Sequence, residues 1–131
     1  MFTFSSFFMS EIDFEKMFSL LEALTSLDRV IVEGVNDKKS LESFGVSRII
    51  TVKRRAIYKV VESIPKGSRI AILTDLDSEG KKIYSMLNKE FSQRGVHIDN
   101  KLRDFLFKNT DLRQIEGLKR FVERRCLTLE M

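Results

Sequence analysis

Short apolar runs rich in valine and isoleucine alternate with segments of helical period from about residue 28 onward. Strands that alternate with helices at this spacing are typical of right-handed crossovers between parallel strands, which place helices on both faces of the sheet. The sequence therefore predicts an α/β, Rossmann-like three-layer fold with about four mainly parallel strands. The predicted strands are residues 29–33, 46–52, 69–74 and 96–98.

The remaining periodic segments predict helices. Apolar side chains recur at helical spacing over residues 11 to about 26, with Ser10 in the position of an N-cap. The other predicted helices are residues 37–44, 56–63, 78–94 and 112–125. Gly45 and Gly95 end two of them. We expect residues 1–27 to form an N-terminal helical extension and residues 28–131 to form one domain.

The composition permits a polyanionic partner without requiring one. The net charge is +4, and much of the positive charge falls in residues 53–55, 81–82 and 101–125. The single cysteine, Cys126, excludes an internal disulfide and a zinc site with several thiolates, and it fits a reducing cytoplasm. No apolar stretch reaches the roughly 18 residues that a membrane span needs, so we expect a cytoplasmic protein with no membrane contact.

Acidic residues stand at the ends of two predicted strands. Glu33 closes the first strand, and Asp75 and Asp77 follow the third. In a parallel sheet, side chains just past the carboxyl ends of the strands line the edge where ligands bind. Three mutually repelling carboxylates at one edge are expected to hold a hard divalent cation, Mg²⁺ or in its place Mn²⁺.

Each acid alone has a simpler explanation. Glu33 by itself fits an ordinary charge at a strand end, and Asp75 by itself fits a helix N-cap. Two unrelated features would not usually place acids at neighbouring strand ends, so the joint pattern favours a metal site.

Basic residues are expected on the same edge. Lys53, Arg54 and Arg55 directly follow the second predicted strand, and Lys81 and Lys82 begin the helix after the second acidic segment. Cations beside a metal site suit a phosphodiester backbone, which they position without reading its sequence. A solvated turn is the simpler explanation for any one of them.

The two acidic segments resemble the motifs of the Toprim fold, which bacterial primases, topoisomerases and the 5S ribosomal RNA maturation endonuclease share. Val-Glu-Gly at residues 32–34 resembles the first motif, and Asp-Leu-Asp-Ser-Glu-Gly at residues 75–80 resembles the second, Asp-x-Asp-x-x-Gly. The resemblance covers about residues 28–125. It is greatest to stand-alone small Toprim proteins and to the Toprim half of the 5S endonuclease.

The resemblance implies a role for each matched residue. Asp75 and Asp77 would hold Mg²⁺, partly through water. Glu33 would be a further ligand or the general acid/base of phosphoryl transfer. Gly34 and Gly80 would let the backbone turn sharply and approach a phosphate closely.

A later segment, residues 109–118, resembles a motif that lies near the metal site in small Toprim proteins. Its candidate residues are Arg113, as a nucleic-acid contact, and Glu116. An ion pair between them on a helix surface is the simpler explanation. Asp37, which follows the first motif, is expected to cap the next helix.

The first expectation is therefore a Mg²⁺-dependent protein with nuclease-like chemistry on RNA or DNA, active in RNA processing or DNA repair. One alternative is a nucleic-acid-binding or complex-forming Toprim module that cleaves nothing, as a homodimer or within a larger assembly. Another is a metal-dependent hydrolase of small phosphorylated molecules. We do not expect a complete primase or topoisomerase, because the sequence contains no zinc-binding or template-handling segment and no tyrosine outside the predicted helices.

Overall fold

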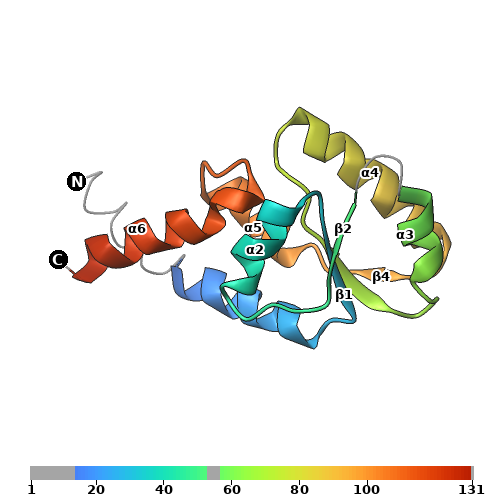
Figure 1. Cartoon of the computed structure of the whole chain (residues 1–131), viewed down its shortest axis with the longest axis horizontal. Coiled ribbons are helices and arrows are strands. Elements are labelled where there is room, and N and C mark those ends of the chain that lie inside the picture. Colours follow the sequence, from blue (N-terminus) through green and yellow to red (C-terminus); the bar gives the residue numbers. More distant parts are fainter. Residues whose placement is uncertain (1–13, 53–56, 131) are drawn as a thin grey trace.

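Four parallel strands form the central sheet of the computed structural model, which describes residues 14–52 and 57–130 and, of residues 126–130, only the backbone. The order across the sheet is β2-β1-β3-β4 (Figure 1). The strands are β1 (Arg29–Val32), β2 (Ile49–Thr51), β3 (Arg69–Ile72) and β4 (His97–Ile98). The predicted α/β class and parallel sheet are confirmed, although the strands are shorter than the sequence predicted.

Helices cover both faces of this sheet and complete the three layers. On one face lie α3 (Ile57–Ser63) and α4 (Ser78–Gln93), and on the other lie α2 (Val35–Glu42), α5 (Lys101–Asn109), α6 (Leu118–Glu130) and the helix of residues 14–23. Side chains along β1 point alternately to the two faces of the sheet. Val30 and Val32 therefore join one hydrophobic cluster, and Ile31 joins the other. This double burial explains why the strands read as continuous apolar runs.

The N-terminal helix is part of the core on the α2 side. Residues 14–23 are helical, and a 3₁₀ turn, η1 (Leu24–Ser26), follows them. Met17, Leu21, Leu24 and Leu27 are all buried in the same cluster as β1 and α6. The predicted helix start at residue 11 and its Ser10 cap lie outside the described residues. Among the helices that the structure describes, none is both long and apolar enough to cross a bilayer.

Two predicted boundaries shift for local reasons. Helix α2 begins at Val35, because the Asp37 carboxylate accepts the N–H of Gly34 and closes the first turn there. Strand β2 begins at Ile49, because Arg48 has a φ of 58°, outside the extended region.

The predicted start of the last helix, residues 112–125, is wrong. Residues 110–114 are not helical, a 3₁₀ turn η3 (Ile115–Gly117) follows them, and only then does α6 begin. The reason is that this backbone bonds to the loop after β3. Leu76 donates its N–H to the carbonyl of Arg113 at 2.7 Å, and Ile115 donates its N–H to the carboxylate of Asp75 at 2.9 Å.

The topology places a switch point between β1 and β3. From β1 the chain passes through α2 to β2 at one edge, and from β3 it passes through α4 to β4 at the other edge. Helices α2 and α4 lie on opposite faces of the sheet. Ligands of open α/β sheets bind at this kind of switch point, outside the carboxyl ends of the strands.

Candidate active site

Glu33 and Asp75 meet at the switch point. Glu33 directly follows β1, and Asp75 follows the end of β3 by three residues. The backbone N–H of Asp75 donates to Oε2 of Glu33 at 2.7 Å. Residues 42 positions apart are therefore joined by a hydrogen bond at the carboxyl edge of the sheet, which is the juxtaposition that the strand-end pattern predicted.

Asp77 stands at the start of α4 and is the N-cap of that helix. Its Oδ1 accepts the N–H of Gly80 at 2.8 Å. The capping role that the sequence offered as an explanation for Asp75 thus belongs to Asp77. Asp75 uses its Oδ1 differently, as the acceptor for the N–H of Ile115.

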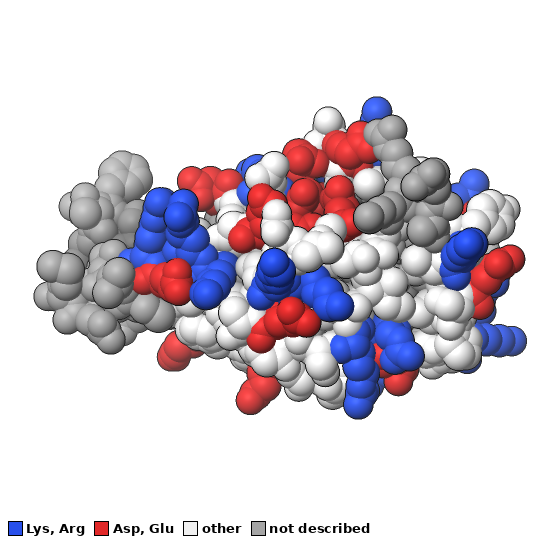
Figure 2. All heavy atoms as spheres, in the orientation of Figure 1, with Lys and Arg blue, Asp and Glu red and all other residues white. Residues whose placement is uncertain are grey.

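Two further carboxylates face the same region. Asp37 is only 5% exposed, and its Oδ2 accepts the N–H of Gly34 at 3.0 Å, which fits the expected cap of α2. Glu116 lies on η3, and its charge contributes to raising the pKa of Asp37 and of Asp75. We call Glu33, Asp37, Asp75, Asp77 and Glu116 the acidic cluster. Figure 2 shows acidic side chains gathered between the regions of α2 and α4.

Burial and mutual repulsion make Glu33, Asp37 and Asp75 harder to ionise. Burial raises the pKa of Asp37 from 3.8 to about 6, and the charge of Asp75 contributes to the rise. Burial is also the main cause that raises the pKa of Glu33, with further contributions from Asp75, Asp37 and Asp77. The pKa of Asp75 is raised by burial and then by the charges of Asp77 and Glu116, while the bond from Ile115 lowers it.

Arg103, on α5, is the cation of this site, and the sequence analysis missed it. Its side chain donates to the carbonyl oxygens of Thr74 at 3.3 Å and Asp75 at 3.0 Å, and its guanidinium lies 4.1 Å from the ring centroid of Tyr84. Burial lowers the pKa of Arg103, while the charges of Glu33 and Asp75 act in the opposite direction. No sequence signal marks this arginine, because α5 reaches the site only through tertiary packing.

The donor set suits a hard cation held partly through water. No three His, Cys, Asp or Glu side chains of the described residues converge closely enough to enclose a metal ion by themselves. Mg²⁺ keeps several waters and is usually bound by one or two carboxylates together with substrate phosphates. Carboxylates that raise one another's pKa therefore fit such an ion without forming a closed protein cage.

The two motif glycines differ in what surrounds them. A Cβ at Gly80 would overlap the carbonyl oxygen of Asp75 and lie 2.5 Å from its carbonyl carbon. A Cβ at Gly34 would meet only Oδ2 of Asp37, at 3.9 Å. Gly80 is thus required for the close packing of α4 on the loop after β3, a reason that the motif alone did not reveal.

The predicted basic residues of two segments differ in what the structure shows of them. Lys53, Arg54 and Arg55 lie outside the described residues. Lys81 and Lys82 are exposed in the first turn of α4. Helix α4 begins at the carboxyl edge of the sheet, so the position of Lys81 agrees with the sequence prediction.

Arg113 lies in the non-helical segment before η3, so the helix surface predicted to carry Arg113 and Glu116 together is not formed. The guanidinium of Arg113 donates to the carbonyl oxygens of Thr110 and Leu112. Arg113 and Lys81 also flank the exposed ring of Phe107, at 5.2 and 4.7 Å from its centroid. Two cations from distant segments are thereby brought together beside the acidic cluster.

Comparisons with known proteins give relatives in archaea. The chain is 31% identical over 120 residues to the UPF0292 protein MJ1624 of Methanocaldococcus jannaschii, a match that covers 86% of this chain and 94% of that protein. It is 30% identical over 104 residues to the UPF0292 protein PYRAB04740 of Pyrococcus abyssi, with 76% and 79% covered. No family model matches the chain.

A solved structure has a similar fold. A protein from Aquifex aeolicus superposes with a TM-score of 0.70 and 27% sequence identity, covering 79% of this chain and 95% of that one. The likeness supports the three-layer arrangement described above. The names of these relatives state no activity, so function has to be argued from the site itself.

Proposed function

The chain belongs to the UPF0292 family, and we propose that it is a Mg²⁺-dependent protein with nuclease-like phosphodiester chemistry on RNA or DNA. The observation that carries the proposal is the hydrogen bond from the Asp75 N–H to Glu33, which unites the two acidic segments at the switch point of the sheet. The resemblance of these segments to the Toprim motifs supports the same assignment.

Asp75 and Asp77 are the residues that would hold the ion. Each has one oxygen engaged by a backbone N–H, from Ile115 and Gly80 respectively, which leaves the second oxygen outside these bonds. The engaged oxygen fixes the orientation of the carboxylate before any ion arrives. A bound Mg²⁺ supplies a Lewis acid that stabilises charge on the phosphate oxygens.

Glu33 is proposed as the general acid/base. Burial and the neighbouring carboxylates raise its pKa, which brings the group closer to the pH range in which it can accept and return a proton. The Asp75 N–H holds Oε2, so the side chain keeps one orientation in both protonation states.

Arg103 is proposed as a positioning residue. It binds the carbonyl oxygens of Thr74 and Asp75, the two residues that lead into the second acidic segment. It therefore fixes the loop that carries Asp75.

The flanking residues would contact the substrate backbone. Lys81 and Arg113 lie beside the acidic cluster and offer positive charge for phosphates. We extend the same proposal to Lys82 and to the Lys53–Arg55 run. Gly34 and Gly80 are proposed to allow a phosphate to approach the backbone, and the single cysteine favours a reducing cytoplasm as the place of action.

One observation favours a second candidate, a nucleic-acid-binding module that cleaves nothing. Within the described part of the chain, no three ligand side chains converge on one point. A protein that only binds nucleic acid, alone or in a larger assembly, would not need such convergence.

Cleavage assays with a matched variant test the proposal. Labelled single-stranded, duplex and structured RNA and DNA are incubated with the protein in Mg²⁺, Mn²⁺ or EDTA, beside Glu33→Gln. The amide can still accept the Asp75 N–H but cannot exchange a proton, so the variant should fold, bind nucleic acid and lose turnover.

The outcomes separate the candidates. Metal-dependent products that are absent with Glu33→Gln would support the nuclease and identify its substrate. Equal products from both proteins would refute the role of Glu33. Binding of ion and nucleic acid without any product would favour the binding module.

A further inference from the structure

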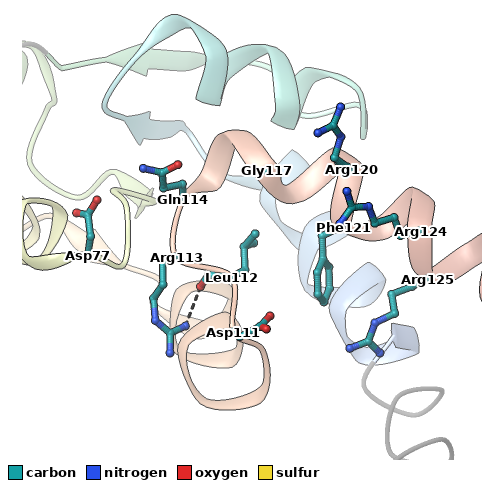
Figure 3. Close-up of a pocket in the computed structure, with 10 residues that line it drawn as sticks. All are labelled: Asp77, Asp111, Leu112, Arg113, Gln114, Gly117, Arg120, Phe121, Arg124 and Arg125. Carbon is teal, nitrogen blue, oxygen red and sulfur yellow. Dashed lines mark hydrogen bonds between the residues drawn. The ribbon is translucent and has the colours of Figure 1, made fainter.

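An open groove of about 650 Å³ runs beside the acidic cluster, between residues 111–114 and α6. Figure 3 shows Asp77 at one end of it and the arginines of α6 at the other. The residues that line the groove are Asp77, Asp111, Leu112, Arg113, Gln114, Gly117, Arg120, Phe121, Arg124 and Arg125.

The groove is predominantly cationic. Four arginines line it, against the two carboxylates of Asp77 and Asp111. Arg120 and Arg124 are four residues apart on α6 and thus share one face of the helix.

The chemistry of these side chains suits a phosphodiester. Arginine presents a planar fork of N–H donors that matches phosphate oxygens, and a row of such forks can track a polyanion. Asp77 connects the groove to the acidic cluster. A nucleic-acid strand bound along α6 would therefore bring its phosphates toward the proposed catalytic residues.

Aromatic rings accompany the cations. Arg125 lies 5.0 Å from the ring centroid of Phe121. Phe107 is 43% exposed and is flanked by Lys81 and Arg113, the latter a groove residue. Both cations lie over this exposed ring, so the ring could stack an unpaired base once the phosphates of the ligand draw the cations away from it.

From these observations we propose that the groove binds the phosphodiester backbone of single-stranded nucleic acid and leads it to the acidic cluster, with Phe107 stacking a base. This inference rests on the proposed function for its ligand class. Duplex nucleic acid is disfavoured, because its bases are not available to stack on the ring.

Binding, measured without turnover, tests the groove. Fluorescence anisotropy of labelled short oligouridylate and oligothymidylate is recorded in EDTA over a range of salt concentrations. Arg120→Gln/Arg124→Gln should weaken binding roughly tenfold or more and reduce the slope of log affinity against log salt by about 0.7 for each phosphate that is no longer neutralised. Phe107→Ala should weaken binding and leave the salt slope unchanged, because stacking releases no counterions.

A charge-matched control is available at the other end of α4. Lys89→Gln/Arg94→Gln also removes two positive charges, but from exposed positions near the C-terminus of that helix. This variant should bind as the wild type does, apart from the small effect of net charge. Circular dichroism of each variant checks that the fold is retained.

The results would distinguish this inference from the proposed function. Unchanged affinity and salt slope in Arg120→Gln/Arg124→Gln would overturn the proposal that the groove binds nucleic acid, even if metal-dependent cleavage is found. Equal loss in the control, or duplex bound as tightly as single strands, would overturn it as well. Selective loss in the groove variant would support it, even if the wild type cleaves nothing.

Discussion

Replacing Gly80 by alanine should destabilise the protein through a clash of backbone with backbone. The added Cβ would overlap the carbonyl oxygen of Asp75 and lie 2.5 Å from its carbonyl carbon and 2.8 Å from its Cα. Carbon atoms in favourable contact lie about 3.5–4.0 Å apart, so the first turn of α4 would have to move by about 1 Å. No side-chain rotation can relieve the overlap, because these neighbouring atoms all belong to the main chain.

The expected size follows from two opposing effects. Overpacking of this kind typically costs about 1–3 kcal/mol, while alanine gains up to about 1 kcal/mol over glycine in a helix interior. Gly80 is near the helix start, where that gain is smaller. The movement would also strain two bonds of 2.8 Å, from Gly80 to Asp77 and from Thr74 to the Gly80 carbonyl. We expect a net loss of about 2–3 kcal/mol, or a fall of roughly 6–12 °C in Tm.

Gly34→Ala is the matched control. Its Cβ would meet one side-chain oxygen at an ordinary distance, and Gly34 has a φ of −143°, which any residue can adopt. Alanine is a weaker N-cap than glycine, so we expect a cost below about 1 kcal/mol. Thermal unfolding followed by circular dichroism compares the two variants. Equal Tm values would refute the packing argument and leave phosphate approach as the only reason for Gly80.

Three further predictions concern the acidic cluster and Arg103. Because folding raises the pKa of Asp37 from 3.8 to about 6, the folded state binds more protons than the unfolded state between these values, and stability should fall as the pH rises through them. Asp37→Asn should remove this loss, gaining up to about 3 kcal/mol at pH 8 and almost nothing below pH 4; urea unfolding at both pH values is the check, and an unaltered pH dependence would contradict it. Mg²⁺ should raise the Tm of the wild type above its value in EDTA, while Asp75→Asn/Asp77→Asn should show no such rise in the same thermal scans. Arg103→Lys should cost about 1–3 kcal/mol despite its retained charge, because an ammonium cannot reproduce the bonds to Thr74 and Asp75 and the stacking on Tyr84; urea unfolding with a wild-type midpoint would count against this role.

The parts of the fold that depend on local pattern were predictable. Strands β1 and β3 are buried on both faces, so they stand out in the sequence as apolar runs, and the acids at their ends are visible there too. Helix α4 ends where expected, since Gly95 has a φ of 77° just after its C-cap. The meeting of Glu33 and Asp75 followed from the rule that parallel strands share a carboxyl edge.

The parts that depend on distant backbone contacts were not predictable. The apolar spacing of residues 112–125 fits a helix, but the carbonyl of Arg113 and the N–H of Ile115 bond to residues about forty positions earlier. No propensity of the local residues records this competition. Arg103 likewise looks like any other cation of the basic residues 101–125 until α5 packs against the loop after β3.

The hydrogen bonds of the acidic cluster separate the structural use of these acids from their functional use. Glu33, Asp37, Asp75 and Asp77 each accept at least one backbone N–H, which explains why a polar acceptor is needed at each position. Asparagine or glutamine could accept the same bonds without a charge. Carboxylates instead repel one another and, once buried, have raised pKa values at three of these positions. Capping roles account for the oxygens, and the helix dipole favours the charges of Asp37 and Asp77, but neither accounts for the charge of Glu33 or Asp75. A positively charged ligand that the chain does not itself supply would account for it, and this is the reason to look first for a divalent cation.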